Sequence, residues 1–142
     1  MRIINKTTWN TKDIRNFANI ILEKEAHELD TLVIQYQRGG LLGQGSYSRR
    51  WISLSFPNAK MEQIAGNDGK NHTIKVPHEL IQGTQLVSIA STLVHEIAHN
   101  RGIYHKDMDC SGIDKLEFPE LENVQIKRED KKSKPRIDHI EL

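Results

Sequence analysis

Apolar residues recur at helical spacing in the segment KDIRNFANIILEKEAHEL, which covers residues 12–29. They stand three or four positions apart with charged residues between them, which is the pattern of an amphipathic helix. Thr11 precedes the segment and is suited to cap the N-terminus of the helix. The apolar positions are Ile14, Phe17, Ala18, Ile21 and Leu22. We therefore predict a helix that packs this side against a core.

Three later segments carry the β-branched and aromatic residues that are typical of strands. They are TLVIQYQ (31–37), RRWISLSFP (49–57) and NHTIKVP (71–77). The segment RGGLLGQGSYS (38–48) separates the first two and is rich in glycine. It predicts a hairpin or a wide loop, in which the glycines provide flexibility.

A second helix is predicted from Thr84, after Gly83, to about Arg101, where Gly102 provides a stop. At about 100° per residue, its apolar and polar residues gather on opposite sides. The apolar side holds Leu86, Ile89, Ala90, Leu93, Val94, Ile97 and Ala98. The polar side holds Ser88, Thr92, His95 and His99. Both histidines are therefore expected to point away from the core.

These elements predict an α+β domain with an N-terminal helix, a short and mostly antiparallel twisted sheet, and the second helix. We assign this domain to residues 1–124. Residues 125–142, QIKREDKKSKPRIDHIEL, are rich in charge and poor in large apolar residues. We expect a flexible, solvated tail there, although its basic residues could instead contact phosphates or an acidic partner. Those residues are Lys127, Arg128, Lys131, Lys132, Lys134 and Arg136.

Composition and charge narrow the class of protein. The chain has 142 residues, of which 37% are hydrophobic and 27% charged, and this fits one soluble globular domain. A formal net charge of +1 gives no general attraction to nucleic acid or an anionic membrane. No apolar run is long enough to span a bilayer, and MRIINKTTWN lacks the features of a secretory signal, so we expect a cytoplasmic protein. Cys110 is the only cysteine, which excludes an internal disulfide and a cysteine-based zinc site.

The candidate metal ligands and the candidate catalytic base lie in one segment, TLVHEIAHNRGIYHKD (residues 92–107). His95 and His99 stand one helical turn apart, so their rings can bind a single ion. A catalytic zinc site typically has three protein ligands and one open position. Glu96 projects beside such an ion, where a carboxylate can act as general base toward metal-activated water. The alternative is a solvated helix face, but Glu96 and the apolar back of the helix favour a site.

His105 follows the glycine stop and is the expected third ligand. A carboxylate can also complete a site with two histidines, and the remaining candidates are Asp107, Asp109 and the remote His139. The two aspartates could instead accept hydrogen bonds from ligand rings. Three other histidines have no partner at ligand spacing, and we expect them to be structural or on the surface; they are His27, His72 and His78.

The motif resembles two groups of metallopeptidases. Residues 95–105 fit the extended metzincin signature HExxHxxGxxH. Met108 follows only three residues later and is the last methionine, so the methionine turn of metzincins is not matched. The stretch STLVHEIAHNRGIYH, with Asn100 after the second histidine, more closely resembles the SprT-like and WLM group. This resemblance covers residues 92–105 in motif and about residues 11–107 in layout, with GIYH in place of the Gly-Pro-His of WLM members.

The resemblance implies a small zincin-like domain in which an N-terminal helix and a short sheet precede the active-site helix. It implies one Zn²⁺ per chain held by His95, His99 and His105, with Glu96 as the catalytic base. The implied reaction is hydrolysis of peptide bonds in a protein or peptide substrate. In several members the substrates are proteins associated with DNA, which makes DNA a candidate partner, and no membrane is involved.

An extended peptide could add to an exposed sheet edge, and the strands at 71–76 and 49–56 are candidates. Tyr47, Arg101 and Tyr104 are candidate donors to an oxyanion. The competing interpretation is a catalytically silent or highly restricted zinc-binding domain that acts as a protein-binding or regulatory module. The presence of Glu96 favours the enzyme.

Overall fold

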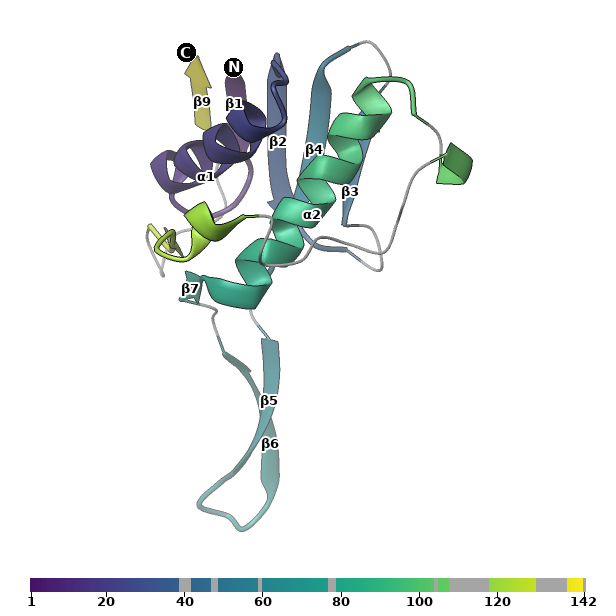
Figure 1. The fold of residues 1–142 in the computed structure, drawn as a ribbon. Helices are drawn as coiled ribbons and strands as arrows, with labels where there is room; N and C mark the ends of the chain where they lie inside the picture. Colours follow the sequence, from purple (N-terminus) through teal and green to yellow (C-terminus); the bar gives the residue numbers. More distant parts are fainter. Residues whose placement is uncertain are drawn as a thin grey trace.

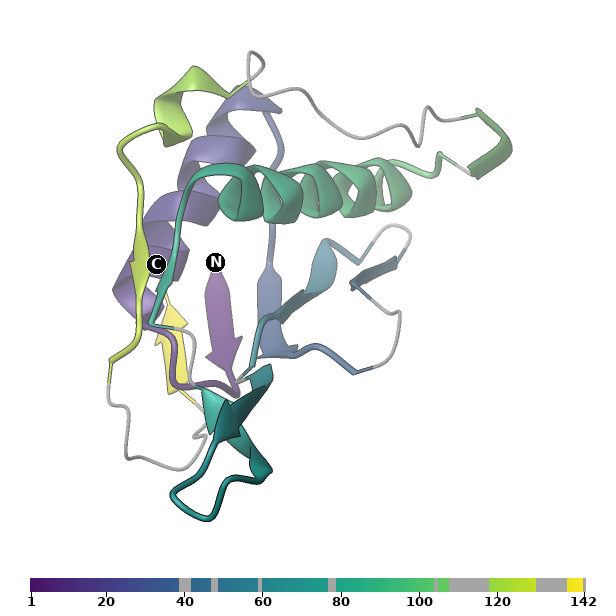
Figure 2. The ribbon, with the colours of Figure 1, turned by 90° about the horizontal axis from the view of Figure 1, so that it is seen from below.

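The computed structural model describes residues 1–38, 42–46, 49–58, 60–76, 79–103, 105–107, 118–129 and 138–141. This part of the chain forms a small α+β domain with two α-helices and a mixed five-stranded sheet (Figure 1). Both helices lie on the same face of the sheet, as a perpendicular view also shows (Figure 2). Among the described residues, no helix has the length and apolar character that crossing a membrane requires.

The main sheet has the strand order β3-β4-β2-β1-β9. Its strands are β1 (Arg2–Asn5), β2 (Thr31–Tyr36), β3 (Gly43–Ser46), β4 (Trp51–Phe56) and β9 (Asp138–Glu141). The three central strands run parallel, and the two outer strands run antiparallel to their neighbours. The sheet is therefore mixed, where the sequence led us to expect a mostly antiparallel one. Two features explain this difference. The helix that follows the short strand β1, a strand that the sequence does not predict, returns the chain parallel to β1. In addition, β3 lies between β2 and β4 in the chain and runs antiparallel to β4, so β4 pairs parallel with β2.

That first helix, α1 (Thr11–Lys24), packs on the sheet beside the second helix. The apolar residues predicted to face the core are all buried. Its N-cap is Asn10 rather than Thr11, because the Asn10 side chain accepts a hydrogen bond from the Asp13 N–H at 3.0 Å. Thr11 instead accepts a hydrogen bond from the Asn5 amide at 2.9 Å, within a buried network that fixes the turn from β1 to α1.

The second helix, α2 (Gly83–Asn100), confirms the predicted element within a residue or two at each end. Gly83 and Gly102 bracket it with φ angles of 59° and 81°, a backbone region that glycine adopts without steric cost. The buried side includes the predicted residues Leu86, Ile89, Ala90, Leu93 and Ile97. Two polar residues, Glu96 and Asn100, are buried as well, and the apolar periodicity did not predict this.

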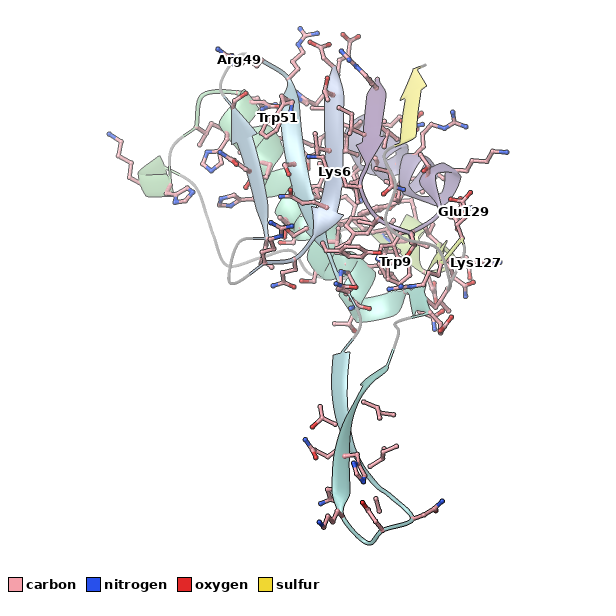
Figure 3. All side chains as sticks on the ribbon, turned by 180° about the vertical axis from the view of Figure 1, so that it is seen from behind. Lys6, Trp9, Arg49, Trp51, Lys127 and Glu129 are labelled. Carbon is pink, nitrogen blue, oxygen red and sulfur yellow. The ribbon has the colours of Figure 1, made fainter. Side chains whose placement is uncertain are left out.

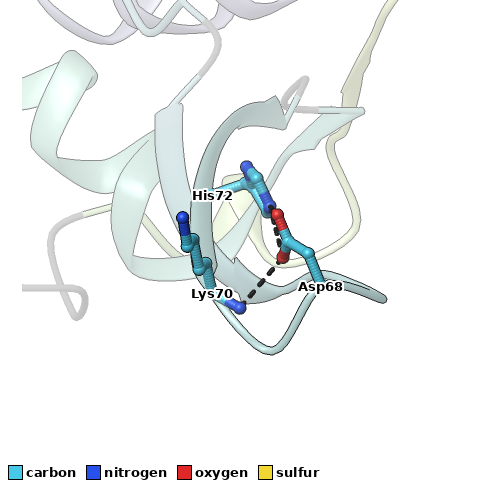
Figure 4. Close-up of polar contacts among 3 residues, drawn as sticks. All are labelled: Asp68, Lys70 and His72. Atoms are coloured by element: carbon cyan, nitrogen blue, oxygen red, sulfur yellow. Dashed lines mark hydrogen bonds and ion pairs between the residues drawn. The ribbon is translucent and has the colours of Figure 1, made fainter.

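A hairpin of β5 (Lys60–Ala65) and β6 (Asn71–Val76) projects away from the body of the domain (Figure 1). Its side chains between positions 63 and 74 are exposed, apart from partly buried Gly66. At its turn the Asp68 carboxylate accepts hydrogen bonds from the Lys70 backbone N–H and from His72, at 2.9 and 3.0 Å (Figure 4). The Lys70 N–H, followed by His72, lowers the pKa of Asp68.

The segment after α2 returns to the first half of the domain. A short 3₁₀ helix, η3 (Pro119–Leu121), precedes β8 (Ile126–Lys127), which pairs with β7 (Leu80–Ile81). The Arg128 guanidinium lies 4.8 Å from the Trp9 ring centre, and Figure 3 shows Lys127 and Glu129 beside Trp9. Residues 126–129 thus pack on the domain and β9 joins its sheet, within the stretch where the sequence predicts a solvated tail.

Candidate metal centre

Three histidines from two elements converge at the end of α2. His95 and His99 lie one turn apart on α2, and His105 begins the short 3₁₀ helix η1 (His105–Asp107). The Nε2 atom of His105 lies 3.2 Å from Nε2 of His95 and 3.0 Å from Nε2 of His99. One ring nitrogen from each residue lies within 4.8 Å of the others, and the three could hold a metal ion.

The chemistry of this donor set fits a cation better than a set of hydrogen bonds. Zn–N bonds of 2.0–2.1 Å at tetrahedral angles place ligand nitrogens about 3.3 Å apart, close to the 3.0 and 3.2 Å found here. A neutral His105 ring has one N–H hydrogen at most on Nε2, which cannot point well at two acceptors. One cation among the rings would satisfy all three lone pairs.

The turn after α2 sets the orientation of His99. Gly102 reverses the chain and brings the Ile103 carbonyl oxygen within 3.0 Å of His99 Nδ1. A carbonyl oxygen only accepts, so Nδ1 carries the hydrogen and donates it. Nε2 of His99 therefore presents its lone pair to the cluster. A partner of this kind on the second ring nitrogen is typical of histidines that bind metals.

Burial also favours the metal-binding form of His95. Partial burial lowers the pKa of His95, and the nearby His99 and His105 rings lower it further. A lowered pKa keeps the imidazole neutral at neutral pH, and metals bind the neutral ring.

Glu96 is placed beside the cluster but turned toward β3. The residue is 5% exposed, and burial raises the pKa of its carboxyl group, against a smaller opposing effect of His99. It nevertheless lines the same cleft as the three histidines. A carboxyl group in this position can exchange protons with a molecule in the cleft.

The cleft has a volume of about 510 Å³ and lies between α2 and β3. Besides the histidines and Glu96, its lining residues are Leu42, Gly43, Gln44, Gly45, Ser88, Ser91 and Thr92. β3 is the outermost strand on this side of the described sheet. The Ser55 N–H donates to the Leu42 carbonyl, just before β3 begins. Every second residue from Leu42, which means Gln44 and Ser46, therefore directs its backbone N–H and C=O groups at β4. The N–H and C=O groups of Gly43 and Gly45 therefore point to the open edge.

These two glycines also allow α2 to approach the strand closely. A Cβ atom on Gly43 would lie 2.8 Å from Thr92 Cγ2, and one on Gly45 would lie 2.9 Å from the Glu96 carbonyl oxygen. Both distances are shorter than carbon atoms tolerate, so the packing requires glycine. From the sequence these glycines are expected to provide loop flexibility, which is not the role that they have here. The available signal was their spacing of two, since isolated glycines in a strand mark close backbone approach.

The three other candidate ligands differ in their position relative to the cluster. Asp107 follows His105 within η1, and Asp109 lies outside the described residues. His139 lies on β9, at the sheet edge opposite β3, and four strand spacings separate the two edges by about 19 Å. The structure thus brings His105 to the pair on α2 and keeps the His139 position far from it.

Of the three expected oxyanion donors, the structure describes Arg101 alone. Arg101 donates to the Glu25 carbonyl and pairs with the Glu25 carboxylate, so it joins the C-terminal ends of the two helices instead. Tyr47 and Tyr104 lie outside the described residues. Of the strands expected to offer an open edge, β4 is paired on both sides, and β6 belongs to the projecting hairpin. β3 is the edge strand that borders the cleft.

The other histidines have the roles expected of them where the structure describes them. His27 follows α1 and lies 3.3 Å from the Asn100 side chain, and His72 pairs with Asp68 on the hairpin. His78 and Cys110 lie outside the described residues, as do Lys131, Lys132, Lys134 and Arg136.

Comparison of the chain with protein-family models, with curated proteins and with solved structures gave no match.

Proposed function

We propose that the protein is a zinc-dependent peptidase of the zincin type, with one Zn²⁺ held by His95, His99 and His105. The observation that carries the proposal is the convergence of three imidazole nitrogens beside a buried glutamate on an open cleft. The ligand types and the spacing of 3.0–3.2 Å suit zinc. The resemblance of the motif to SprT-like and WLM peptidases supports the same assignment.

The cleft suits an extended peptide. Gly43 and Gly45 direct backbone donors and acceptors outward, and a peptide strand can pair with such an edge. The peptide would then lie between β3 and the polar side of α2, where Ser88, Ser91 and Thr92 line the cleft. A peptide bound in this way would have a scissile bond near the histidines, and backbone pairing would not require a particular side chain.

Glu96 has the role of general base in this proposal. A bound zinc ion would supply the Lewis acidity that polarises the scissile carbonyl and makes water more acidic. The Glu96 carboxylate accepts a proton as the water oxygen attacks the carbonyl carbon, and it delivers that proton to the leaving amide nitrogen as the C–N bond breaks. β3 orients the peptide backbone during both transfers.

The metal is tested first, by elemental mass spectrometry of the purified protein and of the His105→Ala variant. We expect about one zinc per chain in the wild type and a greatly weakened site in the variant. Absence of zinc after incubation with a small excess of the metal would overturn the proposal. The three histidines would then be the polar side of an ordinary helix and its exit turn.

Catalysis is tested with the zinc-loaded protein and the Glu96→Gln variant on a mixture of unstructured peptides, with products identified by mass spectrometry. We expect hydrolysis by the wild type and a loss of about 10²–10⁴-fold in the variant, which keeps its metal. Unchanged turnover in the variant would refute the assigned role of Glu96. Co-purified proteins are assayed in parallel, because an enzyme restricted to one substrate would cleave that protein alone.

A further inference from the structure

The contact between α2 and β3 follows a single stripe of the helix. Thr92, Glu96 and Asn100 stand four residues apart and so share one side of α2. Thr92 and Glu96 meet Gly43 and Gly45 through close packing. Asn100 stands at the end of the stripe, next to His99 in sequence, and it contributes hydrogen bonds.

The Asn100 side chain joins three elements. It is 8% exposed, and its amide group donates to the carbonyl oxygens of Ser46, at 2.6 Å, and Trp51, at 3.3 Å. Ser46 ends β3, Trp51 begins β4, and the two are partners in the ladder. The side-chain oxygen of Asn100, Oδ1, lies 3.3 Å from Nε2 of His27, which donates a hydrogen bond to it. The side chain therefore links the end of β3 and the start of β4 to the C-terminal ends of both helices.

We propose that Asn100 is a positioning residue that holds the open edge of β3 at its place beside Glu96 and the histidines. The inference rests on the proposed function where it concerns peptide binding, because that edge is the one to which a peptide would add. β3 has four residues and a neighbour on one side within the described sheet, so the β4 ladder alone leaves it free to tilt. The two hydrogen bonds from Asn100 restrain that tilt at the end of the strand that follows Gly45.

Arg101 provides a matched control. It lies beside Asn100 at the end of α2, but its guanidinium contacts Glu25, after the end of α1, instead of β3. Loss of Arg101 removes a helix-end contact of similar kind while leaving the link to β3 intact. A general loosening of the helix end would therefore follow from either substitution, whereas loosening of β3 is expected from loss of Asn100 alone.

The test is amide hydrogen exchange of the full-length protein, with and without zinc, in the wild type and in the Asn100→Ala and Arg101→Ala variants. The Gln44 and Ser46 amides point at β4 and report on the opening of β3. Because two hydrogen bonds are lost, we expect Asn100→Ala to accelerate their exchange about tenfold or more. Exchange in β2 should not change. Unchanged exchange at these amides, or the same acceleration in Arg101→Ala, would overturn the inference.

If the Asn100→Ala variant does not fold, the exchange measurement is made on Asn100→Ser instead. Its short hydroxyl does not reach both carbonyls, so we expect the same direction of change. In peptide assays either Asn100 variant should raise KM about tenfold with a smaller effect on kcat and no loss of zinc. If no peptide is hydrolysed even by the wild type, the proposed function fails, but the exchange measurement still decides the role of Asn100.

Discussion

Gly45 occupies a position where any side chain would collide with the candidate base. A Cβ atom there would lie 2.9 Å from the Glu96 carbonyl oxygen and 3.0 Å from Glu96 Oε2. We expect Gly45→Ala to push Glu96 and β3 apart and to destabilise the fold by about 1–3 kcal/mol, as overpacking does. Zinc content should stay at the wild-type level, because the three ligands lie on α2 and η1. Chemical denaturation and elemental analysis measure the two effects.

Gln44→Ala is the control for that substitution, since the Gln44 side chain is exposed on the same strand. It should change stability by less than about 0.5 kcal/mol. Equal stabilities of the Gly45→Ala variant and the wild type would show that β3 can move away from α2 without cost.

Asn5 is the clearest buried polar residue outside the cleft. It is fully buried, and its amide donates to the Trp9 carbonyl, at 2.7 Å, and to the Thr11 hydroxyl, while its oxygen accepts from Thr7. Asn5→Ala removes these buried hydrogen bonds, so we expect a loss of about 2–4 kcal/mol. At about 4 °C per kcal/mol, Tm should fall by about 8–16 °C. Asn71→Ala, on the exposed hairpin, should leave Tm unchanged, and a similar Tm for both variants would contradict the role of the network.

The spacing of residues along the sequence predicts the three histidines, because they lie on one helix and the turn that follows it. His95, His99 and His105 follow from helical geometry and the glycine stop, and the structure brings them together. Gly43, Gly45 and Asn100 could not be assigned in this way. Their roles depend on the side of α2 that meets β3, and this contact joins segments about 50 residues apart that no local pattern relates.

At the scale of elements, the three histidines would link η1 to α2 through the metal. A ligand that binds only the folded state stabilises it, by about 2.7 kcal/mol at 100 times its Kd. We therefore expect zinc at that concentration to raise Tm by about 10 °C. The shift should be reversed by a chelator and nearly absent in the His105→Ala variant. A shift of equal size in that variant would place the stabilising zinc elsewhere on the protein.

We expect the β5–β6 hairpin to contribute little to stability, because its described side chains are exposed. Isolated two-stranded hairpins are marginally stable in water and add little to a core that they do not contact. Replacing residues 62–74 with an Asn-Gly turn should change Tm by less than about 4 °C. Thermal melts of the shortened and full-length chains test this, and a large loss of stability would mean that the hairpin packs on the domain in solution.

Sequence patterns predicted the long elements and missed the short ones. Both helices carry apolar residues over several turns, so their periodicity is distinct. β1 and β9 have four residues each, and β5, KMEQIA, has little of the alternation that marks a strand. Their positions are set by pairing partners that lie far away in the chain, and this pairing also makes the sheet mixed.

At the scale of the whole molecule, the sheet separates the two ends of the chain from the cleft. β9 pairs with β1 at one edge, whereas β3 forms the opposite edge beside the candidate centre. A substitution or truncation at the β9 edge should therefore affect stability and leave the metal site intact. This separation can be tested because β9 ends the described chain and its removal leaves the other strands in place.

A chain that ends at Glu129 tests the separation. Loss of β9 removes four paired positions from β1 and exposes its edge to water, which should cost roughly 1–3 kcal/mol in net hydrogen bonding. Zinc content should equal that of the full-length protein, because the ligands lie on α2 and η1 and His99 is oriented by the turn after Gly102. Chemical denaturation and elemental analysis measure both quantities on the same sample. Loss of zinc together with stability would mean that the C-terminal residues reach the cleft, and the order of the strands would then not explain how the site is supported.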